Sequence, residues 1–203
     1  LEVARCLAEI GALLEQQDYI WKCAYTEHIP PSTRYDFNQF RDYFLSLDWA
    51  RDALLIDLQA LPWGVQIDHA PWLTVDFTTT SVERPIIVNR TFRYRSFLFP
   101  WQALVEKYGS RMVFLGQADE HADFVKSFGW VPRLASATLL EAARWIAGAK
   151  VFIGNQSCLM AIALGLGVNT LQETWAANPN CRLTGRKNAL YVLDECADIP
   201  AHW

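Results

Sequence analysis

The order of apolar and polar residues divides this 203-residue chain into two parts. In the first part, apolar residues recur every three to four positions, which predicts helices over residues 3–16, 36–45 and 48–61. A short aromatic segment over 18–26 predicts a single strand. The stretch from 70 to 84 is rich in Pro and Thr, which is typical of an extended interdomain linker rather than a packed element.

After this stretch, short apolar runs alternate with helical patterns. Strands are predicted over 85–88, 111–115, 130–134, 150–153 and 168–171. Helices are predicted over 100–108, 118–128, 138–147 and 157–166. Such alternation with right-handed crossovers builds a parallel sheet with helices on both faces. The pattern therefore predicts an α/β, Rossmann-like domain over 83–203, preceded by a helix-rich, incomplete N-terminal domain over 1–82.

Composition and charge narrow the classes of function. No apolar run reaches the roughly 18 residues that a membrane helix needs, and no signal-peptide pattern is visible at the N-terminus. The five cysteines are scattered and form no CxxC pair, which argues against a zinc site or a disulfide framework and for a reducing, cytoplasmic location. The net charge of −4 makes a nucleic-acid partner an unfavourable interpretation.

The segment Gly154-Asn155-Gln156-Ser157 carries the strongest chemical signal. It follows a buried apolar strand and precedes an apolar helix, so it forms a turn at the carboxyl end of a strand. In open α/β sheets ligands bind at this edge, and the free N–H groups of a helix N-terminus favour a phosphate or carboxylate. The alternative is that Asn155 or Ser157 only caps the helix.

Arginines follow the first strand of the predicted sheet. Arg90, Arg93 and Arg95 lie within six residues, and Thr91 adds a hydroxyl. Guanidinium groups bind phosphate through a bidentate fork, so this loop is a candidate anion site. The alternative is a solvated loop whose arginines pair with surface acids.

Two further turns end at the same edge. Gly116 permits close backbone approach, and Glu120 either faces the cleft or complements the helix dipole. Glu173 follows the next strand and is suited to accept hydrogen bonds from ribose hydroxyls, or is a surface acid. The chain has no GxGxxG, GxxxxGK[ST], GxSxG or HExxH motif, and no Cys/His cluster for a metal.

Several segments together resemble a known family. The chain is similar to the C-terminal half of GT-B glycosyltransferases, nearest to the ADP-heptose lipopolysaccharide heptosyltransferases and related phage and environmental proteins. The residues that carry this resemblance are 144–157, 161–167, 171–173, 89–91, 99–101, 114–116 and 120–121. Where those heptosyltransferases have Asp-Thr-Gly and then His, this chain has Asn155-Gln156-Ser157 and Met160.

The resemblance implies a metal-independent glycosyltransferase that needs no cofactor. Its substrates are a nucleotide-sugar donor and a saccharide or other hydroxyl acceptor. The implied donor site comprises Arg90, Thr91, Arg93, Arg95, Gly116, Glu120, Gly154, Asn155, Gln156, Ser157 and Glu173. No general base is assigned, and Asp68 and Asp76 are candidates near the hinge. The alternative function is a non-catalytic GT-B-like binding or structural module, for example in a phage particle.

Overall fold

The computed structural model describes residues 2–24, 31, 53–78, 85–177, 179–182, 185–192 and 198–203, without the side chains of residues 2–7 and 179. The predicted helix over 36–45 lies outside the described residues, as does the boundary at residue 82.

Six parallel strands form one sheet in the order β3-β2-β1-β4-β5-β6. They are β1 (Ile86–Asn89), β2 (Met112–Leu115), β3 (Arg133–Leu134), β4 (Val151–Asn155), β5 (Asn169–Glu173) and β6 (Ala189–Val192). The chain order reverses between β1 and β4, so the sheet has a topological switch point there. This arrangement confirms the predicted α/β fold with a parallel sheet.

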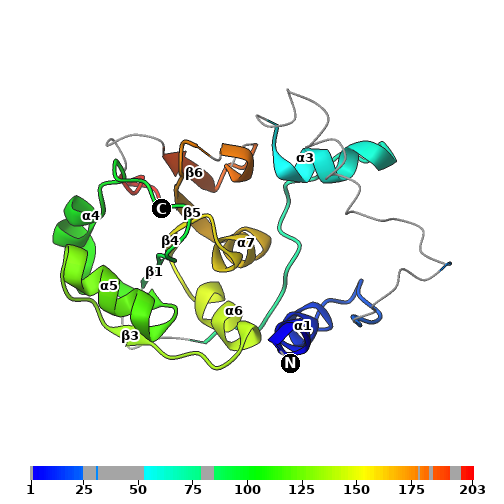
Figure 1. Ribbon diagram of the computed structural model, residues 1–203, viewed down its shortest axis with the longest axis horizontal. Coiled ribbons are helices and arrows are strands. Elements are labelled where there is room, and N and C mark those ends of the chain that lie inside the picture. Colours follow the sequence, from blue (N-terminus) through cyan, green and yellow to red (C-terminus); the bar gives the residue numbers. More distant parts are fainter. Residues whose placement is uncertain are drawn as a thin grey trace.

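Helices cover both faces of the sheet (Figure 1). They are α4 (Trp101–Tyr108) and α5 (Ala118–Phe128) on one side, and α6 (Leu139–Ala147) and α7 (Cys158–Gly165) on the other. Short 3-10 helices are η3 (Leu61–Trp63), η4 (Gly109–Arg111) and η5 (Pro179–Cys181). The predicted helices over 100–108, 118–128, 138–147 and 157–166 are confirmed with small shifts in their ends.

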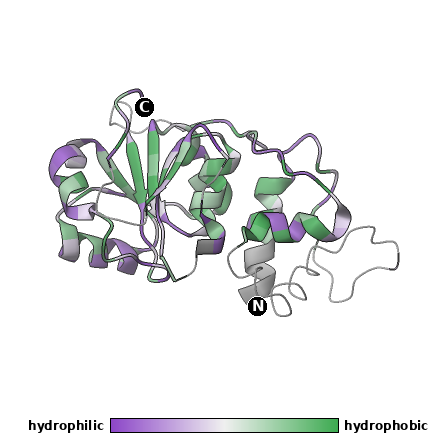
Figure 2. Ribbon diagram, turned by 90° about the horizontal axis from the view of Figure 1, so that it is seen from above, coloured by the Kyte–Doolittle hydropathy of each residue, from purple (hydrophilic) through white to green (hydrophobic). Residues whose placement is uncertain are grey.

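Successive strand residues point to opposite faces and pack into two separate cores. Ile87 and Phe152 join the α6–α7 core, whereas Ile86, Val88 and Ile153 join the α4–α5 core. Because both faces are covered, β1 and β4 are buried along their whole length, and their residues before Asn89 and Gly154 are continuously apolar rather than alternating, as Figure 2 shows.

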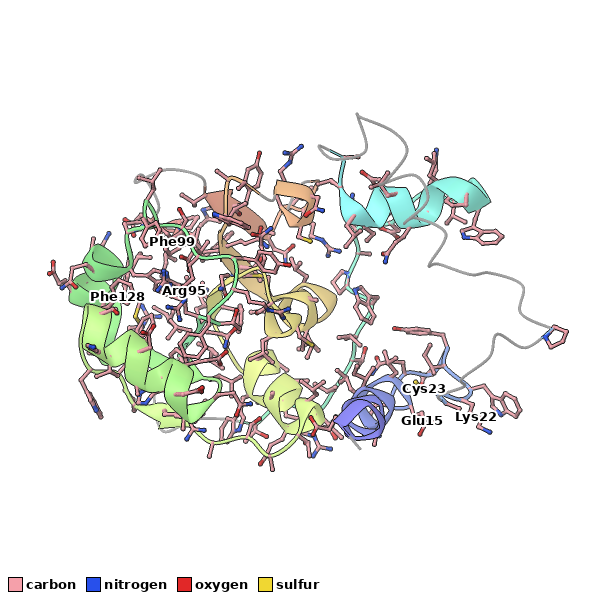
Figure 3. All side chains as sticks on the ribbon, viewed as in Figure 1. Glu15, Lys22, Cys23, Arg95, Phe99 and Phe128 are labelled. Atoms are coloured by element: carbon pink, nitrogen blue, oxygen red, sulfur yellow. The ribbon has the colours of Figure 1, made fainter. Side chains whose placement is uncertain are left out.

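In the first part of the chain, some of the observed elements differ from those that the sequence predicts. Helix α1 (Glu2–Leu14) confirms the prediction over 3–16 and packs against α6. The predicted strand over 18–26 is wrong for residues 18–24, which form turns and coil. The chain bends back here, and the N–H of Cys23 donates to a carboxylate oxygen of Glu15 at 3.0 Å (Figure 3). Within 48–61, the described helix is α3 (Leu55–Ala60), which continues into η3.

The segment over 70–84 is extended, but its described part, residues 70–78, is packed and does not behave as a free linker. Leu73 is buried, and the N–H groups of Trp72 and Leu73 both donate to the carbonyl of Gly165 in α7 at 2.8 Å. A β-carbon on Gly165 would lie 2.7 Å from the Leu73 side chain, so this glycine permits the close approach.

Candidate functional site

A cavity of about 370 Å³ lies at the carboxyl edge of the sheet, between α3, the N-terminus of α7 and the segment around η5. This is the edge at which ligands bind in open parallel sheets, beside the switch point. The cavity is lined by Leu54, Leu55, Ile56, Gln59, His69, Arg93, Tyr94, Gln156, Ser157, Cys158, Met160, Ala161, Leu164, Gln172, Asn180, Cys181, Arg182 and Arg186.

The N-terminus of α7 forms one wall of this cavity. Ser157 caps the helix, because its hydroxyl oxygen accepts from the N–H of Met160 at 3.3 Å. The same hydroxyl donates to the side-chain oxygen of Asn89 at 3.0 Å, which fixes the turn against β1. Ser157 therefore caps the helix and also lines the cavity. Gln156 lines the cavity as well. The partial positive charge of the helix N-terminus points to this wall.

Three arginines supply positive charge to the cavity: Arg93, Arg182 and Arg186. The guanidinium of Arg186 donates to the carbonyls of His69 at 2.9 Å and Leu164 at 3.3 Å. Burial lowers the pKa of Arg186 from its ordinary value, and the charge of Asp68 opposes this shift. A partly desolvated cation is stabilised by an anion placed beside it. No Asp or Glu is among the described residues that line the cavity.

Arg90 and Glu173 bind each other instead of lining the cavity. The Nε of Arg90 lies 3.0 Å from one carboxylate oxygen of Glu173, and a terminal nitrogen lies 3.0 Å from the other. Both side chains are buried. The backbone N–H of Ser96 and the indole N–H of Trp101 also donate to Glu173, at 2.8 Å and 2.9 Å. The predicted contacts of Arg90 with a diphosphate and of Glu173 with a ribose stay predictions. In the structure, the two side chains hold the loop after β1.

Arg95 and Thr91 likewise lie outside the cavity. Arg95 pairs with Asp123 of α5 at 2.7 Å and donates to the carbonyl of Thr91 at 2.8 Å. Figure 3 shows Arg95 with Phe99 and Phe128 on the side of the sheet that carries α4 and α5. Of the three predicted arginines, only Arg93 lines the cavity.

Asn155 and Gly154 belong to the end of β4 rather than to the cavity lining. Asn155 is fully buried, and its side chain bonds to Thr91 and to the backbone carbonyl of Arg93. A β-carbon on Gly154 would lie 2.8 Å from the carbonyl oxygen of Asn89, so glycine permits the close packing of β4 and β1. These two residues therefore support the turns beside the cavity without lining it themselves.

Glu120 takes part in the start of α5, and Gly116 lies close to its carboxylate: a β-carbon on Gly116 would lie 3.0 Å from a Glu120 oxygen. Glu120 accepts from the backbone N–H of Gln117 at 3.1 Å, which forms the capping box of α5. This matches the dipole interpretation of the turn, and neither residue lines the cavity. The candidate bases Asp68 and Asp76 do not line it either, whereas His69, which lies beside Asp68, does.

Sequence reasoning missed the wall formed by Asn180, Arg182 and Arg186. These residues precede β6, which the pattern did not predict. Two arginines just before a short strand were the available signal. Among the described residues, no group of three or more His, Cys, Asp or Glu could hold a metal ion. No described helix is long and apolar enough to cross a membrane.

Two cysteines of the cavity give a chemical probe. Cys158 and Cys181 reach solvent, yet partial burial raises the pKa of both thiols. Because the thiolate is the nucleophile, we expect both to react with iodoacetamide more slowly than free cysteine at pH 8, with the difference shrinking as the pH rises. Peptide mass spectrometry measures the rates.

Ligand protection extends this probe to the cavity itself. A molecule that occupies the cavity is expected to slow labelling of Cys158 and Cys181, while Cys23, which does not line the cavity, is the internal control. Equal slowing at Cys23 would argue against occupation of the cavity.

Comparison with known proteins gives similarity of fold. No family model and no curated protein matches the chain. Among solved structures, it is similar to E. coli heptosyltransferase WaaC with ADP (18% identity, TM-score 0.45), over 68% of this chain and 48% of that one. It is also similar to dodecameric iron-containing heptosyltransferase TibC in complex with ADP-D-beta-D-heptose (16%, 0.49), over 69% and 40%.

A third similar structure is a glycosyl transferase of family 9 from Veillonella parvula (14% identity, TM-score 0.43), over 69% of this chain and 49% of that one. The resemblance drawn from the sequence is thus confirmed as structural similarity to heptosyltransferases of glycosyltransferase family 9. The chain spans less than half the length of these structures.

Proposed function

We propose that the chain carries the nucleotide-sugar-binding domain of a GT-B-type glycosyltransferase, which moves a sugar from a nucleotide-sugar donor to a hydroxyl acceptor without a metal ion. The observation that carries this proposal is the cavity at the carboxyl edge of the sheet, with three arginines and a helix N-terminus on its walls. As the glycosidic bond breaks, negative charge develops on the departing diphosphate. Fixed cations and N–H groups stabilise that charge without a metal.

The lining suits the two ends of a nucleoside diphosphate. Arg93, Arg186 and the N-terminus of α7 supply positive charge and N–H groups for the phosphates. Leu55, Ile56 and other apolar residues of the opposite wall suit a flat nucleobase or another apolar group. In this proposal, residues 83–203 supply the groups that bind the diphosphate, and residues 54–56 supply an apolar wall of the same donor site.

Calorimetric titration with ADP, UDP and GDP tests the proposal. We expect at least one of them to bind, and Arg93→Gln to weaken that binding about tenfold or more, because a charge-assisted hydrogen bond is lost. Arg93 is the suitable position because its side chain is exposed. The matched control is Lys126→Gln on α5, which removes one exposed cation that does not line the cavity. Absence of binding at millimolar nucleotide, or equal weakening in the control, would overturn the donor site.

One observation favours the second candidate function, a non-catalytic GT-B-like module. Among the described residues that line the cavity, none is a carboxylate, a group that commonly serves as the general base for a hydroxyl acceptor. Incubation of the protein with UDP-sugars and ADP-sugars in EDTA separates the two. An enzyme releases nucleoside diphosphate when a hydroxyl acceptor is supplied, whereas a module binds the nucleotide sugar and returns it unchanged.

A further inference from the structure

Tyr94 has an unusual backbone conformation at the mouth of the cavity. Its φ is 55°, and it is the one non-glycine residue with a left-handed φ in the described part of the chain. A bulky residue rarely adopts this conformation unless its surroundings impose it, and such residues gather at functional sites. Here the buried side chain of Asn155 bonds to Thr91 and to the carbonyl of Arg93, which fixes the residues just before Tyr94.

The enforced conformation brings Tyr94 beside a second aromatic ring. The ring centroids of Tyr94 and Trp175 are 6.0 Å apart, with 41° between the ring planes. The guanidinium of Arg93 lies 5.7 Å from the Tyr94 centroid. Because the two rings are tilted rather than stacked face to face, each leaves part of its surface for another partner.

Trp175 continues this aromatic surface away from the cavity. It follows β5, is 42% exposed and does not line the cavity. Its backbone N–H donates to the side-chain oxygen of Gln156 at 3.1 Å, so its position is tied to the turn before α7. A molecule in the cavity therefore touches Tyr94 and leaves Trp175 accessible to a second molecule.

The chemistry of this surface suits a sugar ring. The C–H groups on one face of a pyranose are apolar and pack on an aromatic ring, while its hydroxyls accept hydrogen bonds from donors such as a guanidinium. Tyr94, Trp175 and Arg93 supply these groups beside the wall proposed for the diphosphate.

We propose that Tyr94 and Trp175 form a saccharide subsite that holds a pyranose ring of the acceptor beside the donor cavity. The proposal rests on the proposed function for the identity of the neighbouring ligand. The subsite itself binds a neutral glycoside by stacking, so it is measurable without turnover.

Saturation-transfer NMR with methyl glucoside, methyl mannoside, methyl galactoside and their disaccharides tests the subsite, with and without ADP or UDP. We expect a signal on the C–H protons of at least one glycoside, which persists when nucleotide is present. Trp175→Ala is expected to weaken that glycoside about tenfold and to change nucleotide binding less than twofold. Trp175→Phe keeps an aromatic face and is expected to recover most of the affinity.

Trp130→Ala is the matched control, because Trp130 is 73% exposed and lies before β3, at the opposite edge of the sheet. No glycoside signal in the wild type, equal weakening in the control, or displacement of the glycoside by nucleotide would overturn the subsite. If Trp175→Ala weakened the binding of uridine or adenosine but not that of the glycosides, the two rings would be assigned to a nucleobase. That result would also overturn the saccharide subsite. Glycoside binding without any nucleotide binding would support the subsite and overturn the donor site.

Discussion

Replacing Glu173 with alanine is expected to lower the free energy of unfolding by about 3–5 kcal/mol, because it leaves a buried guanidinium without its partner. Glu173 is fully buried and Arg90 is 6% exposed. The carboxylate accepts from Arg90 and also from the N–H groups of Ser96 and Trp101. Its removal therefore unpairs donors from three residues at once. Urea denaturation followed by far-UV circular dichroism measures the loss.

Two comparisons separate the cause from general damage at the site. Arg90→Met combined with Glu173→Met removes both charges and is expected to recover most of the stability, because no charge is then left buried alone. Asp198→Ala breaks the exposed ion pair in which Lys107 Nζ lies 2.5 Å from a carboxylate oxygen of Asp198. This substitution is expected to change the free energy of unfolding little. A loss below about 1 kcal/mol in Glu173→Ala would show that the buried pair contributes no more than an exposed one.

The same pair explains why the arginine-rich loop has a defined shape. Arg90 and Ser96 bracket the loop, and both bind Glu173 at the end of β5. Since β4 lies between β1 and β5, the pair spans the switch point of the sheet. Arg93 lies between these two attachments and lines the cavity. The buried charges thus hold the loop in position, and of the three arginines in the loop Arg93 lines the cavity.

The sheet was predictable because its central strands are buried on both faces. Segments such as 85–88 and 150–153 are continuous apolar runs followed by helical patterns, which local spacing detects. β6 was missed because two of its four residues, Leu190 and Tyr191, are exposed and no helix follows it among the described residues. The strand predicted over 18–26 is absent from residues 18–24. Tyr19 and Trp21 are exposed there, so these aromatic residues do not belong to a core.

The site was predictable only in part. Because the strands are parallel, the polar turns after β1, β4 and β5 were expected to meet at one edge of the sheet. Arg93, Gln156 and Ser157 of these turns do line one cavity. Which turn residues bind one another depends on strand order and side-chain direction, which local spacing does not contain. Local spacing therefore does not reveal that Arg90 and Glu173, which are 83 positions apart, bind each other.

Replacing Asn155 with alanine is expected to cost about 3 kcal/mol of stability, because a buried side chain with several hydrogen bonds is lost. Asn155 accepts from the N–H of Thr91 at 3.1 Å and donates to the carbonyls of Thr91 and Arg93. These bonds fix the chain just before Tyr94, whose φ of 55° needs such support. Nucleotide affinity is expected to fall about tenfold as well, since Arg93 and Tyr94 lose their fixed positions. Urea denaturation and calorimetric titration measure the two effects.

Asn155→Asp tests whether the amide acts as a donor or only fills space. Aspartate has nearly the same volume and keeps the oxygen that accepts from Thr91, but its second oxygen faces the carbonyls of Thr91 and Arg93 without a proton to share. We therefore expect Asn155→Asp to be at least as destabilised as Asn155→Ala at pH 7, while Thr91→Val loses less than about 1.5 kcal/mol because the backbone bonds remain. Wild-type stability in Asn155→Asp would contradict the donor role, because volume alone would then explain the residue.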